Sequence, residues 1–198
     1  MIILIKAVVF DFGGVYFTYS RERRLKAFKK LKKPEKLLDI AWEKYIDDYN
    51  RGKLSEAEFW KKFKGVLEIE VSNKKLREIT LSIFKPIKCV HKIVKELRKK
   101  FKVGLLTDQT NWLDILDKKY GIYKNFDEIV ISCRIGAIKP EKKMYLAMLK
   151  KLKVKPSEVV FVDDDMINVK AAEKLGMKVI LFKNCSQLRR ELKRLGVL

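Results

Sequence analysis

The stretch Lys6-Ala7-Val8-Val9-Phe10-Asp11-Phe12-Gly13-Gly14-Val15 decides the fold. Its apolar, β-branched run predicts a buried strand, and the two glycines after it predict a tight turn. Asp11 is therefore expected at the carboxyl end of a strand, the edge at which open α/β sheets bind their ligands. Taken alone, Asp11 can equally be an ordinary turn or helix-cap aspartate.

The rest of the chain divides into a helical part and an alternating part. Apolar residues at helical spacing predict four helices and no strand between residues 16 and 86, a small helical-bundle domain inserted after the first strand. Helices alternating with short apolar strands then predict an α/β, Rossmann-like doubly wound parallel sheet, built from 1–15 and 87–198. The later strands are expected at 103–106, 128–131, 159–162 and 179–182.

Three further polar clusters follow predicted strands or lie in a loop between them, namely Thr107-Asp108, Lys139-Pro140 and Asp163-Asp164-Asp165. Adjacent carboxylates repel one another unless a cation or a hydrogen-bond donor offsets their charge, and Mg²⁺ prefers oxygen ligands of this kind. Asp165 is expected to cap the helix that starts near Met166. Each cluster alone is a weak signal, but together with Asp11 they indicate phosphoryl transfer.

The composition narrows the class of protein. The 198 residues suit one core with a modest insertion, and no apolar run approaches the ~20 residues of a membrane span. The net charge of +21 would suit nucleic-acid binding, but the lysines are dispersed in a thermophile-like pattern of charged helix faces, so nucleic acid is an unlikely partner. A positive field also attracts small phosphorylated metabolites.

The cysteines and the histidine carry no separate chemistry in this interpretation. Cys89, Cys133 and Cys185 are odd in number and scattered, which predicts no disulfide framework. Together with the lack of a charged leader, this favours a cytoplasmic protein. His91 is interpreted as a surface residue.

In their order along the chain, the four clusters resemble the motifs of the haloacid dehalogenase superfamily of hydrolases. The similar segments are Asp11–Val15, Leu105–Asp108, Gly136–Glu141 and Phe161–Asn168. The segment 16–86 resembles the C1-type cap of this family, and Tyr49–Ser55 is similar to the cap of its phosphatase branch for small sugar phosphates.

The resemblance implies a Mg²⁺-dependent hydrolase of a small phosphomonoester. Asp11 would attack phosphorus to form an aspartyl-phosphate, which water then hydrolyses. Thr107 and Lys139 would bind the phosphoryl oxygens, with Asp108 beside them. The metal would be held by the Asp11 carboxylate, the backbone carbonyl of Gly13 and the carboxylates of Asp163 and Asp164.

One position departs from the family pattern. Its phosphatases usually carry a second aspartate two residues after the nucleophile, where this chain has Gly13. General acid–base assistance is typically worth ~10²–10⁴-fold, so a catalytically weak or regulatory protein is the alternative. A 2-haloacid dehalogenase ranks lower, because it needs no metal and Asp163-Asp164 would then lack a counter-charge. Asp108 as a substitute acid is disfavoured.

Overall fold

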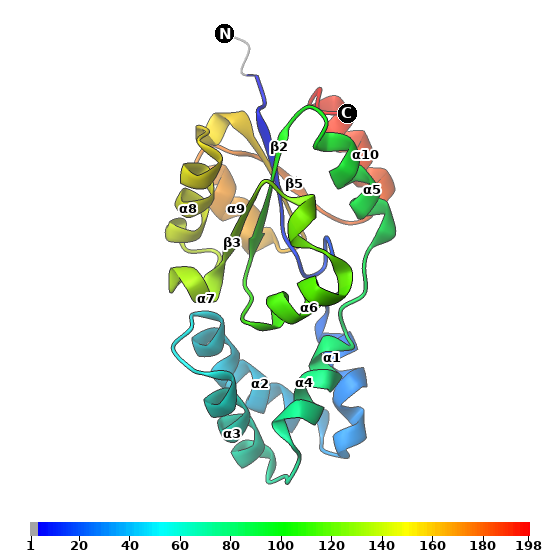
Figure 1. Ribbon diagram of the computed structural model, residues 1–198, viewed down its shortest axis with the longest axis vertical. Coiled ribbons are helices and arrows are strands. Elements are labelled where there is room, and N and C mark those ends of the chain that lie inside the picture. The colour runs from blue at the N-terminus through cyan, green and yellow to red at the C-terminus, as the bar shows by residue number, and fades with distance from the viewer. Residues whose placement is uncertain (1–3) are drawn as a thin grey trace.

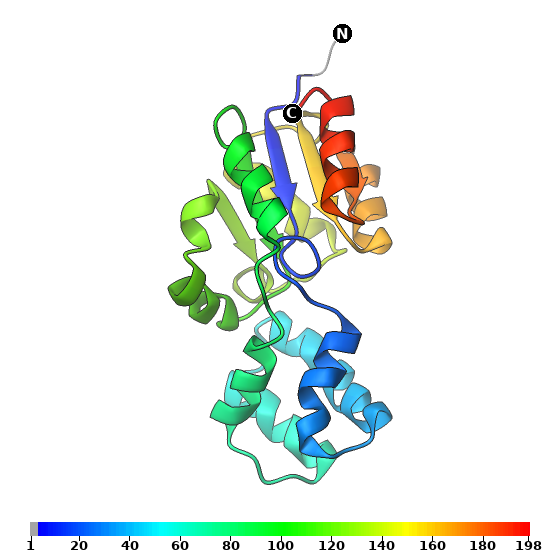
Figure 2. The ribbon, with the colours of Figure 1, turned by 90° about the vertical axis from the view of Figure 1, so that its right-hand side faces the viewer.

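The structure, a computed structural model, describes residues 4–198 and shows two lobes (Figures 1 and 2). One lobe is a parallel sheet of five strands in the order β3-β2-β1-β4-β5, with helices on both faces. The other consists of helices α1–α4 and lies beyond the carboxyl ends of the strands. The predicted Rossmann-like α/β fold is confirmed.

The central strand is β1 (Ala7–Phe10), and all four of its residues are buried. Alternate side chains enter two hydrophobic clusters, because successive residues of a strand point to opposite faces. Val8 and Phe10 belong to one cluster, and Ala7 and Val9 to the other. The remaining strands are β2 (Lys102–Thr107), β3 (Glu128–Ile131), β4 (Val159–Asp163) and β5 (Lys178–Leu181).

Each face of the sheet is covered by its own helices. Residues of α5 (Lys88–Leu97), α6 (Trp112–Tyr120) and α10 (Cys185–Arg194) pack in the cluster of Phe10. Residues of α8 (Lys142–Leu152) and α9 (Met166–Lys174) pack in the cluster of Val9. A short helix that the sequence pattern did not indicate, α7 (Ser132–Ile135), follows β3.

The helical lobe has a hydrophobic core of its own, rich in aromatic rings. It contains α1 (Arg21–Phe28), α2 (Glu35–Asn50), α3 (Glu56–Leu67) and α4 (Asn73–Leu81). Trp42, Phe59 and Trp60 are buried there, as their helical spacing predicts. Ser55 and Glu58, three residues apart, form a capping box at the start of α3.

Two connections join the lobes, and they run together. Thr18 accepts the backbone N–H of Lys85 through its Oγ1 at 3.0 Å and donates its own backbone N–H to the Lys85 carbonyl at 2.8 Å. Phe17 and Pro86 form an antiparallel bridge. The chain therefore leaves the sheet lobe and returns to it at the same place.

Two interpretations from the sequence are wrong. Cys89 and Cys185 form a disulfide that joins α5 to α10 across 96 residues, so the cysteines no longer support a reducing compartment. His91 is half-buried, with its ring stacked on Tyr16 at a centroid distance of 3.8 Å. Sequence pattern missed both because they depend on the packing of α5 against distant segments. Among the described residues, no helix is long and apolar enough to cross a membrane.

Candidate active site

The strand register brings the predicted site residues to one edge of the sheet. Phe10 pairs with Leu105 of β2 and with Val162 of β4. Asp11, Thr107 and Asp163 therefore follow or end three adjacent parallel strands. The backbone N–H of Asp11 donates to the Val162 carbonyl at 2.9 Å, which fixes the first of these residues against β4.

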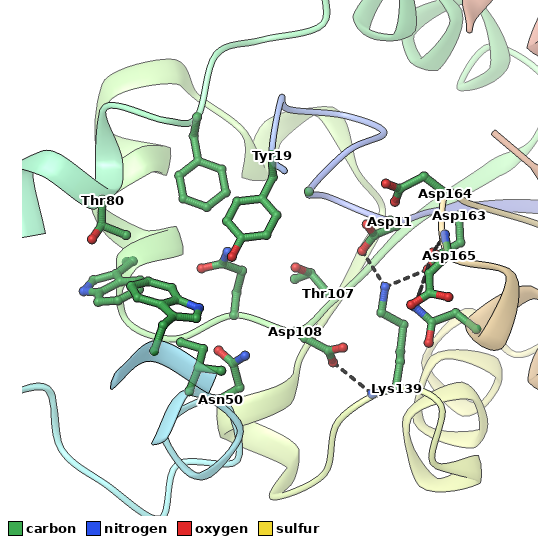
Figure 3. A pocket seen from close by; sticks show the side chains of 17 residues that line it. Asp11, Tyr19, Asn50, Thr80, Thr107, Asp108, Lys139, Asp163, Asp164 and Asp165 are labelled. Atoms are coloured by element: carbon green, nitrogen blue, oxygen red, sulfur yellow. Dashed lines mark hydrogen bonds and ion pairs between the residues drawn. The ribbon is translucent and has the colours of Figure 1, made fainter. Parts of the chain in front are cut away.

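Lys139 lies at the centre of the carboxylates (Figure 3). Its Nζ donates to Asp11 Oδ1 at 2.5 Å and to Asp163 Oδ2 at 2.7 Å. Its side chain is 3% exposed, so these ion pairs are screened very little by water. The peptide bond between Lys139 and Pro140 is cis. Asp108 holds this loop, because its Oδ1 accepts the backbone N–H of Lys139 at 3.0 Å.

Asp163 is the most firmly held carboxylate of the group. Besides Lys139, it accepts the backbone N–H of Asp165 at 2.8 Å and the side-chain amide of Asn168. Asp165 caps α9 through its side chain, as predicted, since its Oδ1 accepts the N–H of Ile167. Asn168 was missed by sequence reasoning, because nothing in a helical asparagine reveals which side chain it contacts.

The carboxylates of Asp11, Asp163 and Asp164 could together hold a metal ion. One oxygen from each lies within 4.8 Å of the others. Such a set of hard oxygen donors suits Mg²⁺. The donor set therefore fits the predicted metal, and all three of these residues were predicted ligands.

Burial and mutual repulsion shift the pKa values in this cluster. Burial raises the pKa of Asp11 well above its usual range, although the Lys139 ammonium opposes this shift. Burial, with the negative charge of Asp163, raises the pKa of Asp164 to about 6. For Lys139 burial acts to lower the pKa, but Asp11 and Asp163 outweigh it and hold the pKa well above its ordinary value. The cluster thus resists further negative charge and favours a cation.

The two glycines after Asp11 differ sharply in what surrounds them. Gly14 has φ +91°, and a Cβ there would lie 2.1 Å from Asp164 Oδ2. Gly13 lacks a positive φ, and its Cβ would lie 3.2 Å from Tyr19 Cβ. Only Gly14 is therefore required by the backbone and by close approach.

A cavity of about 280 Å³ lies between the two lobes, with the carboxylate cluster at one end. Figure 3 shows Asp11, Lys139 and Asp163 at that end, Tyr19 and Thr80 at the other, and Thr107 between them. Predicted site residues in its lining are Asp11, Gly13, Thr107, Asp108, Lys139, Asp163 and Asp164. The structure thus brings all seven together.

Polar contacts also cross between the lobes beside this cavity. Arg51, which follows α2, forms an ion pair with Glu141, which follows the Lys139 loop. Tyr49 donates from its hydroxyl to Asn111 Oδ1 at 2.5 Å. Asn111 precedes α6 and has a residue type that commonly caps helices, but its side chain makes no capping bond and donates to Glu56 of the helical lobe instead.

The chain is similar to known proteins along most of its length. Residues 5–176 match the family model of haloacid dehalogenase-like hydrolases. The chain is 28% identical to D-ribitol-5-phosphate phosphatase of Bacteroides thetaiotaomicron, over 96% of this chain and 97% of that protein. It is 39% identical to mouse bifunctional epoxide hydrolase 2 over 49% of this chain, which spans only 18% of that longer protein.

A solved structure of similar shape is a magnesium complex of a HAD family enzyme from Bacteroides thetaiotaomicron. Its TM-score is 0.80 at 25% identity, covering 94% of this chain and 98% of that one. Family model, fold and the placement of the four motifs at one sheet edge lead to the same assignment. The chain belongs to the haloacid dehalogenase-like hydrolases.

Proposed function

We propose that this protein is a Mg²⁺-dependent phosphatase that hydrolyses a small phosphomonoester through an aspartyl-phosphate. The observation that carries the proposal is the position of Lys139 Nζ in the cavity between the lobes, 2.5 Å from Asp11 Oδ1 and 2.7 Å from Asp163 Oδ2. A buried lysine there fixes the carboxylate that attacks and faces the group that is transferred.

The metal would be held by the carboxylates of Asp11 and Asp164 and by the backbone carbonyl of Gly13. The oxygens of Asp163 already accept several hydrogen bonds, so Asp163 would bind the metal either directly or through a water molecule. Bound Mg²⁺ would neutralise charge on the phosphoryl oxygens and orient them. The magnesium complex of the Bacteroides thetaiotaomicron enzyme supports this assignment.

The reaction would take two displacement steps. A carboxylate oxygen of Asp11 forms a bond to phosphorus while the bond from phosphorus to the ester oxygen breaks, and the alcohol oxygen leaves with that electron pair. Water then attacks the aspartyl-phosphate and releases inorganic phosphate, which restores the Asp11 carboxylate. Thr107 and Lys139 would stabilise the phosphoryl oxygens, with positioning and charge supplying most of the rate.

Gly13 leaves the departing alcohol without a side-chain acid from this loop. Its proton would come from solvent, which slows the loss of a basic alkoxide more than the loss of a weakly basic oxygen. We therefore expect the enzyme to favour substrates with good leaving groups. A catalytically weak protein of regulatory function is the second candidate, and Gly13 is the observation that favours it.

The cavity limits the size of the substrate. At about 280 Å³ it lies at the small end of ligand pockets, which typically measure ~300–1,000 Å³. The match to a D-ribitol-5-phosphate phosphatase along nearly the whole chain supports a sugar-phosphate or polyol-phosphate substrate. We propose that segment 16–86 acts as the cap that closes over it and that 1–15 with 87–198 form the catalytic domain.

The test is hydrolysis of p-nitrophenyl phosphate, whose leaving group needs little protonation. We expect release of p-nitrophenolate with Mg²⁺, none with EDTA, and none from Asp11→Asn. A folded wild-type protein that binds Mg²⁺ without turning over this substrate would favour the regulatory candidate. Release of halide from a 2-haloacid in the presence of EDTA would favour a dehalogenase instead.

A further inference from the structure

The end of the cavity away from the carboxylates has a different chemical character. Besides the carboxylates, the cavity is lined by the aromatic rings of Tyr19, Trp42 and Phe84 and by the polar side chains of Thr80 and Gln109. Figure 3 shows the Tyr19 and Thr80 side chains on the far side of Thr107 from Asp11. A substrate whose phosphate lies at Thr107 would therefore place its carbon chain among these groups.

Gln109 is held rigidly by its backbone. Its N–H donates to Ser132 Oγ at 2.9 Å, and the Ser132 hydroxyl donates back to the Gln109 carbonyl at 3.1 Å. The backbone N–H of Cys133 donates to the same carbonyl at 3.3 Å. The backbone of Gln109 is therefore held in place without any contribution from its side chain.

The side chain of Gln109, in contrast, is left without a partner for its carbonyl. The residue is 8% exposed, and Oε1 accepts no hydrogen bond from any residue between 4 and 198. A buried acceptor that stays unpaired is costly, and buried polar side chains almost always find a partner. Trp112 Nε1 is also unpaired, but its ring, although it lines the cavity too, is packed into the aromatic core of the helical lobe. The inference therefore rests on Gln109.

The chemistry of the amide narrows the class of group that would pair with it. Oε1 needs a donor, which an alkyl chain or a carboxylate does not offer. A hydroxyl both donates and accepts, as does the glutamine amide, and it adds no charge to a cavity that is already lined by several carboxylates. The adjacent aromatic rings suit the C–H faces of a hydroxylated carbon chain.

We infer that Gln109 determines specificity by hydrogen bonding to a hydroxyl on the carbon chain of the substrate. The substrate class is then a phosphomonoester of a short polyol or sugar, and alkyl phosphates of equal length are rejected. This inference rests on the proposed function. An alkyl phosphate would leave Oε1 buried and unpaired, which is the physical basis of the discrimination.

The test compares matched substrates with wild type and Gln109→Leu, a change of similar size that removes the hydrogen bond. One pair is D-ribitol 5-phosphate and pentyl phosphate, and the other is glycerol 3-phosphate and propyl phosphate. We expect wild type to prefer the hydroxylated member of at least one pair in kcat/KM. Gln109→Leu should reduce that preference about tenfold, as the loss of one hydrogen bond to a neutral group predicts. The two members of a pair also differ in their leaving groups. Dividing the kcat/KM ratio of Gln109→Leu by that of wild type cancels this difference, because both proteins act on the same two substrates.

A binding measurement separates this inference from the proposed function. In the Asp11→Asn background, calorimetry with the same four compounds gives dissociation constants without turnover. A preference for the hydroxylated member that Gln109→Leu removes would support the inference even if wild type proved inactive. Equal weakening of both members, or an unchanged ratio in a variant with native circular dichroism, would overturn it. Gln109→Glu, which keeps the shape and the acceptor, should retain more of the preference than Gln109→Leu.

Discussion

Each lobe contains a cluster of charges around a buried ion pair, and the two clusters are balanced differently. In the helical lobe, Asp39 accepts hydrogen bonds from Arg21 and Arg24, and Arg24 also lies 3.7 Å from Glu43. Two cations there face two carboxylates. In the sheet lobe, the single ammonium of Lys139 faces the three carboxylates of the metal-binding set.

The difference separates a structural cluster from a functional one. The Arg24 guanidinium is also stacked 5.1 Å from the centre of the Trp42 ring, so that cluster is complete without any ligand. When all three of its carboxylates are ionised, the sheet-lobe cluster lacks two positive charges, which is the charge of one divalent cation. Uncompensated negative charge among buried carboxylates lowers the stability of the folded protein. Such a charge is expected where a bound ligand supplies the missing positive charge.

Asp11→Asn should give the largest effect, because it removes the proposed nucleophile from the unbalanced cluster. We expect kcat on p-nitrophenyl phosphate to fall about 10⁴-fold or more, the scale seen when a nucleophile is lost. The melting temperature without metal should not fall, since one repelling charge is gone. Activity close to wild type would remove Asp11 from the mechanism.

Asp39→Asn tests the balanced cluster. Leaving the buried guanidinium of Arg24 without its carboxylate should cost about 3 kcal/mol of unfolding free energy, measured by urea denaturation. Asparagine keeps the shape of the aspartate side chain. A decrease in unfolding free energy below about 1 kcal/mol would therefore show that the Arg24–Asp39 pair contributes no more than an ordinary surface ion pair.

The difference in stability between wild type and Asp39→Asn should depend on pH. Although burial acts against ionisation, Arg21 and Arg24 hold the pKa of Asp39 below its ordinary value. A lowered pKa stabilises the folded state above the unfolded-state value of 3.8, and this contribution is lost as the pH falls through the folded-state pKa. Below about pH 4 the stability of wild type should therefore approach that of Asp39→Asn.

Mg²⁺ should bind to the carboxylate cluster of the sheet lobe and not to the cluster around Asp39. A ligand that binds only the folded state at 100 times its dissociation constant adds about 2.7 kcal/mol, so Mg²⁺ should raise the melting temperature of wild type. Asp164→Asn should reduce this shift and Asp39→Asn should keep it. A shift that survives Asp164→Asn would contradict the assigned ligands. This measurement requires no turnover.

Gly13→Asp places a further carboxylate beside the unbalanced cluster. Its Cβ would need Tyr19 to move by only a few tenths of an ångström, and the backbone does not require glycine. With Mg²⁺ bound, we expect roughly a tenfold gain on an alkyl phosphate, below the usual ~10²–10⁴-fold for acid catalysis because of the added repulsion. Hydrolysis of p-nitrophenyl phosphate should change little.

Gly14→Ala is the matched control for that substitution. Its Cβ would collide with Asp164 Oδ2 in a positive-φ backbone, so activity should fall on both substrates. Equal losses from Gly13→Asp and Gly14→Ala would show that both positions need glycine. In that case the missing acid would not be what limits the rate.

Arg51→Ala should give the smallest effect, because the Arg51–Glu141 ion pair between the lobes is partly exposed. Exposed pairs are typically worth ~0.2–1 kcal/mol, so stability should change by less than about 1 kcal/mol. If the pair helps to hold the lobes together over the substrate, KM should rise about twofold while kcat is retained. The rise should disappear at high salt, where wild type loses the same attraction.

The sequence predicts the carboxylate end of the cavity better than the other end. Asp11, Thr107, Lys139 and Asp163 are recognisable because each follows a strand or lies in a motif of fixed order, and parallel strands bring such positions to one edge. Gln109 has no comparable signal. Its importance lies in a hydrogen bond that is not made, which only the packed structure reveals.

Contacts between distant segments explain the other failures. Asn111 has the residue type and position of a helix cap, but Tyr49 and Glu56 from the helical lobe compete successfully for its side chain. Cys89 and Cys185 meet because α5 and α10 pack on the same face of the sheet. Helical periodicity finds the helices and the buried faces, but it does not say which helices become neighbours.

The paired connections at Thr18 and Lys85 have a consequence for how the molecule can be rebuilt. The bridge between Phe17 and Pro86 holds the two ends of the inserted segment about 5 Å apart, the usual spacing of antiparallel neighbours. A segment whose ends already meet can be shortened, lengthened or exchanged without altering the strand register, and chain entropy changes only slowly with its length. If the helical lobe is the cap proposed above, we expect that a different helical segment grafted between these two residues would give the same sheet lobe a new set of substrates.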